Sequence, residues 1–157
     1  GHLDRMADKL ARNVCLHQAL HNYVNRGGHI YAECDGLAYL CKEIRCSMGE
    51  TVPMVGLLPT TAEFQPQLEQ AIPQETRLMK DSWFGKRGTQ LRTYWNPRWQ
   101  LMSSPVVQPL ALTSSDASIV VQHQQVIGNL THLDLLAHPE YLPKILTPAA
   151  HYLSTSS

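Results

Sequence analysis

The stretch HIYAECDGLAYL, residues 29–40, passes from an apolar, β-favouring run through Cys34 into a helix-like run. This order predicts a strand, a sharp turn at the cysteine and a helix. A nucleophile elbow has that geometry, with small residues two positions before and two positions after the nucleophile. Ala32 and Gly36 stand at those offsets, so the stretch predicts a functional thiol at Cys34. The alternative is a buried structural cysteine, because this residue type is commonly buried.

The start of the predicted helix bears on the chemistry of this thiol. Free backbone N–H groups and the positive end of the helix dipole favour a thiolate and can bind an oxyanion. Asp35 and Gly36 are therefore the predicted backbone donors to an oxyanion. The carboxylate of Asp35 opposes this effect, because a neighbouring negative charge disfavours the thiolate.

A nucleophilic cysteine needs a base, and histidine is the usual one. Of the eight histidines, His132 follows a β-like stretch and precedes Asp134 by two positions. This spacing would let the carboxylate orient the imidazole, so Cys34, His132 and Asp134 are the predicted catalytic residues. His17 and His21 lie in a helical pattern, on its polar side, and are expected to be solvated.

Hydrophobic periodicity predicts an α/β domain with a central, mixed sheet. The apolar residues of the first third recur at helical spacing, while the remainder is rich in strand-like runs. The predicted helices cover 3–25 and 35–44, and a turn and helix are expected in 126–146; the predicted strands are 29–33, 52–59, 76–80, 90–95, 106–112 and 118–123.

The composition fits a single folded domain spanning residues 1–157, with 43% apolar and 17% charged residues. Thirteen basic residues balance thirteen acidic ones, so no global field would attract nucleic acid or an anionic membrane. The sequence has no apolar run of membrane-spanning length and no signal-peptide pattern at its start, which predicts a cytoplasmic protein. The four cysteines form no C-x-x-C pair, so neither a zinc ribbon nor a redox motif is predicted, and no metal site is expected. Four cysteines in a chain of this size also predict no disulfide framework.

Several segments also match the patterns of a known family. RGGHIYAECDGLAYL (26–40) is similar to G-G-x-[IV]-Y-A-E-C-G-G-L-x-Y-L, and residues 7–28 resemble the helix that precedes that motif. PMVGLLP (53–59) resembles the following strand and loop, and THLDLLAHPEYL (131–142) looks like a diverged form of Y-[LV]-H-L-H-F-A-x-N-P. These are the patterns of the glutamine amidotransferase domain of cobyrinic acid a,c-diamide synthases.

The resemblance implies a class I glutamine amidotransferase-like fold, related to flavodoxin, with a mixed, mainly parallel sheet flanked by helices. In such domains the cysteine attacks the carboxamide of glutamine and forms a glutamyl thioester, while the histidine moves the proton. Cys34 matches the nucleophile and His132 the histidine, whereas Asp134 occupies the site of a family histidine.

The resemblance also implies a partner. The released ammonia is used by a synthetase domain or chain that needs ATP and Mg²⁺ to amidate a corrinoid carboxylate. The present sequence has no G-x-x-x-x-G-K-[ST] phosphate loop, so no cofactor is expected in this chain.

The chain departs from the family patterns in three places. Asp35 replaces the glycine that normally follows the nucleophile, and residues 86–95 keep only Arg87 and Gly88 of the segment R-G-H-E-F-H-Y-S. GHLD at the start resembles the end of the loop P-G-G-Y-P-E. The domain is therefore expected either to lack its first strands or to carry an added Gly1 and His2.

These departures leave three functional hypotheses open. The first is a glutaminase-type amidotransferase domain, which the retained Cys34 and His132 favour. The second is a non-catalytic pseudo-amidotransferase that serves binding or assembly, which the divergent segment 86–95 favours. The third is a cysteine hydrolase of a different small substrate.

The elbow hypothesis also has structural consequences. Cys34 should end a central parallel strand, and His132 should approach it within about 3 to 4 Å. If the first strands are missing, one edge of the sheet should be unpaired and the chain should form homo-oligomers or aggregate.

Overall fold

The computed structural model describes residues 2–65, 71–95, 98–113 and 118–146, so Gly1 lies outside the described residues. The helices are α1 (Leu3–Ala11), α2 (Val14–Asn25) and α3 (Asp35–Leu40), and residues 141–146 are also helical. The strands are β1 (Ile30–Glu33), β2 (Cys41–Arg45), β3 (Thr51–Pro53), β4 (Leu58–Phe64), β5 (Ile72–Leu78), β6 (Gln90–Trp95), β7 (Trp99–Leu101), β8 (Gln108–Thr113), β9 (Ser118–His123), β10 (Val126–Asn129) and β11 (Thr131–Leu133).

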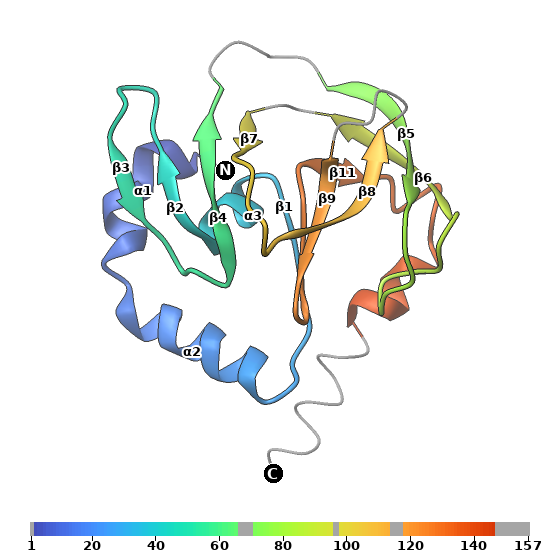
Figure 1. The fold of residues 1–157 in the computed structure, drawn as a ribbon, viewed down its shortest axis with the longest axis horizontal. Coiled ribbons are helices and arrows are strands. Elements are labelled where there is room, and N and C mark those ends of the chain that lie inside the picture. Colours follow the sequence, from blue (N-terminus) through green and yellow to red (C-terminus); the bar gives the residue numbers. More distant parts are fainter. Residues whose placement is uncertain (1, 66–70, 96–97, 114–117, 147–157) are drawn as a thin grey trace.

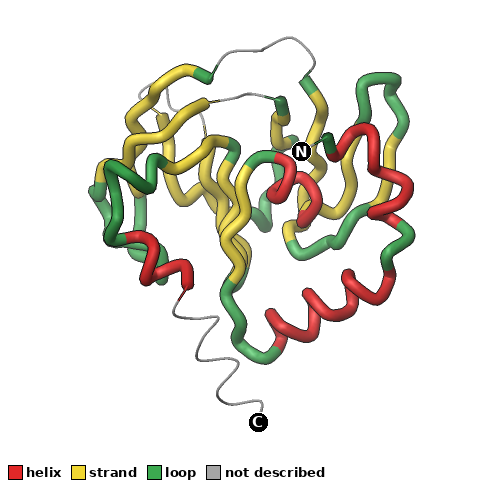
Figure 2. The backbone as a smooth tube through the Cα atoms, turned by 180° about the vertical axis from the view of Figure 1, so that it is seen from behind, coloured by secondary structure: helices red, strands yellow, loops and turns green. Residues whose placement is uncertain are grey.

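The strands form two sheets, and α3 lies between them (Figure 1). Seven strands make the larger sheet in the order β1-β10-β9-β8-β5-β6-β11, and four make the smaller one in the order β3-β2-β4-β7. The view from behind likewise shows α3 near the middle of the molecule, with α1 and α2 on the side of the smaller sheet (Figure 2). The short connection from β1 through α3 to β2 therefore joins one sheet to the other.

Sheets flanked by helices confirm the predicted α/β class, but the sheets are not mainly parallel. Two of the nine described strand pairs are parallel, β1–β10 and β2–β4, and the other seven are antiparallel. Parallel neighbours need a crossover of a dozen or more residues, whereas antiparallel neighbours can be joined by a short turn. Between Cys41 and Leu133 the described segments contain no helix, so most neighbouring strands are antiparallel.

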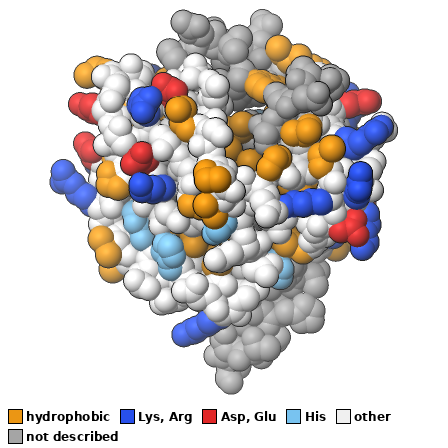
Figure 3. Space-filling model, in the orientation of Figure 1, with side chains coloured by type: hydrophobic (Ala, Val, Ile, Leu, Met, Phe, Trp, Pro, Cys, Tyr) orange, Lys and Arg blue, Asp and Glu red, His pale blue; other side chains and the backbone are white. Residues whose placement is uncertain are grey.

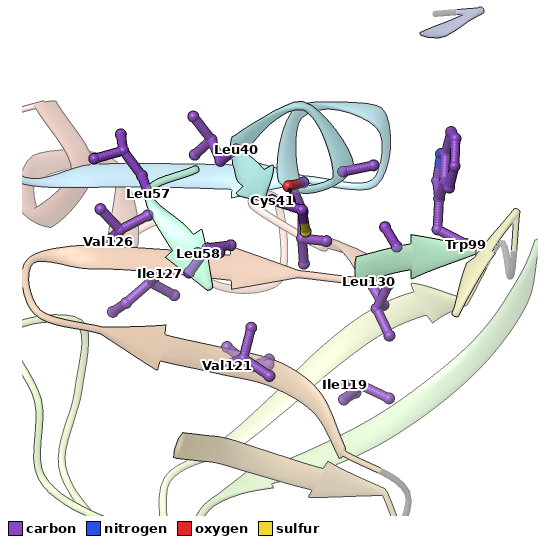
Figure 4. Close-up of a cluster of buried hydrophobic side chains, with 14 of the residues drawn as sticks. Leu40, Cys41, Leu57, Leu58, Trp99, Ile119, Val121, Val126, Ile127 and Leu130 are labelled. Atoms are coloured by element: carbon purple, nitrogen blue, oxygen red, sulfur yellow. Dashed lines mark hydrogen bonds between the residues drawn. The ribbon is translucent and has the colours of Figure 1, made fainter. Parts of the chain in front are cut away.

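The core lies where α3 packs on β10, between the two sheets. A Cβ on Gly128 of β10 would lie 2.8 Å from Leu37 Cδ1 and 3.0 Å from Leu58 Cδ1, so only glycine permits this close approach. Figure 4 shows the surrounding cluster, in which Leu57, directly before β4 of the smaller sheet, lies beside Val126 of β10. Because the core fixes α3 against β10, it also fixes the turn that precedes α3.

The first third of the chain differs from the prediction in two places. The single helix expected over 3–25 is broken at Asn13, whose side chain accepts a hydrogen bond from Leu16 N and caps α2. The second helix ends at Leu40, because the residues that follow form β2, with β3 and β4 on its two sides. Tertiary strand pairing thus overrides a local pattern that also suits a helix.

The later strands largely follow the sequence pattern. The runs 90–95 and 118–123 are β6 and β9, while the runs 76–80 and 106–112 overlap β5 and β8. The strand expected over 52–59 is instead divided into β3 and the start of β4. A bend separates these two strands, and Gly56 adopts φ 80° within it.

Candidate active site

Cys34 occupies the turn between β1 and α3, where the elbow pattern places it. Its φ of 47° and ψ of −112° are unusual for a non-glycine residue, and such a conformation costs about 1–3 kcal/mol. A Cβ on Gly36 would lie 3.6 Å from Ala32 Cβ, so these flanking positions approach each other closely. The residues two positions before and after the cysteine thus adjoin each other across the turn, as the elbow pattern predicts.

The strand that ends at Cys34 is parallel to its neighbour but is not central. Among the described strands, β1 pairs with β10 alone and lies at one end of the larger sheet. The prediction of a parallel strand before Cys34 is therefore confirmed, and the prediction of a central strand is wrong for the described residues. No strand within the described ranges pairs with the other side of β1.

The parallel pairing of β1 and β10 brings Cys34 and His132 together. Glu33 is paired with Asn129, so the residues that follow the two strands emerge at the same edge of the sheet. Cys34 Sγ lies 3.3 Å from His132 Nε2, although 98 positions separate the two residues in sequence. The thiol also lies within reach of the Leu130 carbonyl oxygen, at 3.4 Å. Thiol and imidazole are thus placed for direct proton transfer.

Glu33 holds the opposite side of the imidazole, a contact that the sequence analysis missed. Its Oε2 lies 3.0 Å from His132 Nδ1. Its Oε1 accepts hydrogen bonds from the Tyr31 hydroxyl at 2.7 Å and from Leu133 N at 2.9 Å. Residues 33 and 34 would face opposite sides of a regular strand, so their sequence adjacency alone gave no signal of a shared site. The turn at Cys34 ends this alternation and lets both side chains reach His132.

The structure places Asp134 away from the His132 imidazole. The Asp134 carboxylate accepts hydrogen bonds from the Tyr94 hydroxyl at 3.2 Å and from Ala137 N at 3.1 Å, and it forms an ion pair with Arg92 at 3.5 Å. The orientation expected from the two-residue spacing is wrong because β11 ends at Leu133, and Asp134 begins the next turn. Aspartate side chains commonly bond to backbone N–H groups in such turns.

The environment of Cys34 keeps its thiol protonated. The pKa of Cys34 is raised to about 12, mainly by burial and then by the negative charges of Glu33 and Asp35, while Arg98 acts in the opposite direction. As predicted, the charge of Asp35 raises the pKa of Cys34 and so disfavours the thiolate. The expectation that the helix start would favour a thiolate is not met, because desolvation and two carboxylates outweigh it.

Asp35 has a structural role in addition to its charge. Its carboxylate accepts hydrogen bonds from Trp99 Nε1 at 2.7 Å and from Leu3 N at 3.4 Å. It thereby joins the start of α3 to β7 and to α1. Asp35 and Gly36 form the first turn of α3, and their backbone role towards an oxyanion stays a prediction.

The other histidines considered are bonded to the backbone. His17 Nε2 lies 3.0 Å from the Leu10 carbonyl oxygen, and His21 Nε2 lies 2.7 Å from the Val55 carbonyl oxygen. Both bonds are partly buried, so the expectation of two solvated side chains is wrong. A helical pattern shows which face is polar but not which part of the chain folds over it.

The remaining predicted features lie outside this pair. Arg87 and Gly88 belong to the turn between β5 and β6, where Arg87 N donates to Asp81.

Within the described ranges, no three His, Cys, Asp or Glu side chains gather as metal ligands would. In the same ranges, no helix has both the length and the apolar character needed to cross a membrane.

Comparisons with known proteins agree with this fold. A crystal structure of a glutamine amidotransferase superposes with a TM-score of 0.58 and 20% sequence identity, over 87% of this chain and 71% of that one. The chain therefore has a glutamine amidotransferase-like fold, as predicted. Residues 3–140 match the CobB/CobQ-like glutamine amidotransferase domain, and the chain belongs to that family.

Curated relatives of the chain are cobyrinate a,c-diamide synthases. The protein of Dehalococcoides mccartyi (strain 195) is 30% identical over 134 residues, which cover 85% of this chain and 29% of that protein. The protein of Leptospira interrogans serovar copenhageni is 33% identical over 92 residues, which cover 59% of this chain and 20% of that protein. The chain thus spans less than a third of the length of these relatives.

Proposed function

We propose that this domain hydrolyses glutamine through a thioester on Cys34 and supplies the ammonia to a synthetase domain or chain. The observation that carries the proposal is the 3.3 Å separation between Cys34 Sγ and His132 Nε2 at a strained strand-to-helix turn. Membership of the CobB/CobQ-like amidotransferase family supports glutamine as the substrate. The names of the longer relatives support a corrinoid carboxylate as the acceptor of the ammonia.

The neutral thiol dictates how the first step proceeds. With a thiol pKa of about 12, Cys34 is almost fully protonated at neutral pH. In the proposed step Nε2 of His132 takes the thiol proton while Sγ attacks the carboxamide carbon of glutamine. The oxygen of the tetrahedral intermediate becomes negative, and the backbone N–H groups of Asp35 and Gly36 are its proposed donors.

The imidazolium then completes the cycle. His132 returns the proton to the leaving nitrogen, the C–N bond breaks and ammonia departs, which leaves a glutamyl thioester on Cys34. Water then attacks this thioester with His132 as base, and glutamate and the free thiol are formed. ATP and Mg²⁺ belong to the synthetase step in this proposal, because the sequence carries no phosphate loop of its own.

A glutaminase assay on single and double variants tests the proposal. We expect Cys34→Ala and His132→Asn each to remove nearly all activity, and the double variant to be little worse, because residues that act as one unit are non-additive. Cys15→Ala, which removes an exposed thiol, is the control and should retain activity. Full activity in Cys34→Ala would refute the proposal.

The pseudo-amidotransferase is the second candidate function, and one observation favours it. Asp35 stands where the family has glycine, and its charge raises the pKa of the Cys34 thiol. A wild-type chain that binds glutamine without hydrolysing it, alone or with its synthetase partner, would establish this alternative.

A further inference from the structure

We propose that Glu33 is the carboxylate that positions His132, so that Cys34, His132 and Glu33 act as a triad. Glu33 Oε2 lies 3.0 Å from His132 Nδ1, on the side of the ring opposite the 3.3 Å contact to Cys34 Sγ. The inference rests on the proposed function, because a positioning carboxylate affects catalysis only if His132 moves the thiol proton. The carboxylate of this triad directly precedes the nucleophile in sequence.

The Glu33 carboxylate is held in place through its other oxygen. The Tyr31 hydroxyl donates to Oε1 at 2.7 Å, and Leu133 N donates to the same oxygen at 2.9 Å. The Tyr31 hydroxyl in turn accepts a hydrogen bond from Asn129 Nδ2 at 3.0 Å, which directs the hydroxyl proton towards Glu33. Leu133 directly follows His132, so the carboxylate is anchored to the same strand as the imidazole that it contacts.

This arrangement determines the tautomer of the neutral imidazole. An ionised carboxylate can only accept hydrogen bonds, so the ring nitrogen that faces Glu33 must carry the proton. Nδ1 of His132 therefore bears the hydrogen, and the lone pair of Nε2 points at the thiol. That tautomer is the one required to take the proton of Cys34.

The negative charge of Glu33 disfavours ionisation of the neighbouring thiol, an effect that a neutral residue at this position would not have. After burial, this charge is the largest cause of the raised pKa of Cys34. The same charge stabilises the thiolate–imidazolium pair once the proton has moved to His132, because the imidazolium lies between the carboxylate and the thiol. A carboxylate is therefore useful at this position in the reacting state rather than in the resting one.

The test is Glu33→Gln, studied by ¹⁵N NMR of the imidazole and by glutaminase kinetics in the full chain. Leu133 N and the Tyr31 hydroxyl both require an oxygen at the Oε1 position, so the glutamine amide must direct its NH₂ group at His132. That NH₂ group donates to Nδ1 and moves the ring proton to Nε2. The resonance of His132 is identified by its absence in His132→Asn.

The expected result has two parts. The ¹⁵N shifts should report a proton on Nδ1 in the wild type and on Nε2 in Glu33→Gln at a pH where the ring is neutral. The kcat should fall by about 10²–10⁴-fold with KM nearly unchanged, because a wrong tautomer blocks proton transfer without altering glutamine contacts. An Nδ1 proton that persists in Glu33→Gln, or a kcat within threefold of the wild type, would overturn the inference.

Two further variants test whether Glu33 or Asp134 positions His132, and whether the charge of Glu33 matters beyond a structural role. Glu33→Asp keeps the charge on a shorter side chain and should preserve the Nδ1 tautomer and recover part of the lost kcat. Asp134→Asn changes the other candidate carboxylate, and its loss of kcat should be much smaller than that of Glu33→Gln. The reverse order of the two losses would make Asp134 the positioning residue.

The two proposals fail in different ways. A wild-type chain without glutaminase activity would contradict the proposed function, yet the tautomer measurement would still show whether Glu33 orients His132. An active wild type with an active Glu33→Gln variant would refute the triad and leave Cys34 and His132 as a pair.

Discussion

At the scale of single residues, Cys34 combines a strained backbone with a thiol that resists ionisation. The positive φ points the side chain at His132, while burial and two adjacent carboxylates hold the pKa near 12. Cys34 should therefore react slowly with a reagent that needs a preformed thiolate. It should react faster with a glutamine-like substrate, because in the proposed mechanism His132 takes the thiol proton during the attack.

Thiol labelling is the measurement that reveals this difference. With iodoacetamide at pH 7.5 we expect Cys15, which is exposed, to react well before Cys34. With an electrophilic glutamine analogue we expect the order to reverse, because binding aligns the reagent with Cys34 and His132. Mass spectrometry of the modified peptides gives both orders.

Two controls accompany the labelling experiment. Cys34→Ala should lose the analogue label while keeping the folded far-UV and near-UV spectra of the wild type. Preferential modification of Cys41 or Cys46 by the glutamine analogue would contradict the elbow hypothesis.

At the scale of elements, the hydrogen bonds of Asp35 explain why this chain has a charged side chain next to Cys34. The carboxylate ties α3 to Trp99 of β7 and to Leu3 of α1, and the Trp99 side chain is almost fully buried, with 2% exposure. A glycine at this position, as in the family pattern, would leave the buried indole N–H without this acceptor. The departure from the family pattern is thus coupled to packing between three elements.

Replacement of Asp35 should separate its charge from its packing role. Asp35→Asn keeps an oxygen for Trp99 Nε1 and removes the charge, so the pKa of Cys34 should fall and iodoacetamide labelling of Cys34 should become a few-fold faster. Asp35→Gly should speed labelling as well but lower the free energy of unfolding by about 1–3 kcal/mol, because a buried donor loses its partner.

Urea unfolding and labelling rates at pH 8 measure the two effects. Equal stability of Asp35→Asn and Asp35→Gly would show that the Trp99 contact contributes nothing. Slower labelling of Cys34 in Asp35→Asn would contradict the electrostatic account of the thiol.

At the scale of the whole molecule, the two sheets share a core and the surface carries balanced charge. Basic and acidic side chains both occur on each flank of the face shown in Figure 3, and the full sequence has a formal net charge of zero. Cys41 lies in the core with no exposed surface, and burial raises its pKa from 9.0 to about 12. Global stability should therefore depend on pH in the alkaline range.

The sign of this dependence follows from proton linkage. A thiol whose pKa is raised in the folded state stabilises that state fully below pH 9, and the contribution is lost as pH rises from 9 towards 12. For Cys41 alone, the wild type should lose about 1.4 kcal/mol more than Cys41→Ala between pH 7 and pH 10.

Urea unfolding under reducing conditions at both pH values measures this difference. Cys41→Ala should be less stable than the wild type at pH 7, because the buried sulfur and its contact with the Leu37 carbonyl are lost. The gap between the two proteins should narrow at pH 10. A constant gap would show that the Cys41 thiol ionises as easily in the folded chain as in the unfolded one.

The sequence by itself predicted the elbow and the pairing of Cys34 with His132. Strand, cysteine and helix follow from local patterns, because small residues at Ala32 and Gly36 and an apolar run before Cys34 are readable in a dozen residues. His132 was chosen for the β-like stretch before it and for its spacing to Asp134, and its resemblance to a family segment supported that choice. Its 3.3 Å approach to Cys34 agrees with it. Oligomerisation stays a prediction.

Only the tertiary structure decided which carboxylate contacts the His132 imidazole, which strand pairs are parallel and where the second helix ends. Each of these depends on pairing between segments far apart in sequence: Glu33 with Leu133, β1 with β10, and β2 with β4. Local spacing favoured Asp134 because it is two residues from His132, but the end of β11 turns that carboxylate towards Tyr94 and Arg92. Hydrogen bonds between distant strands fix the direction of a side chain, and a local pattern contains no information about its partner strand.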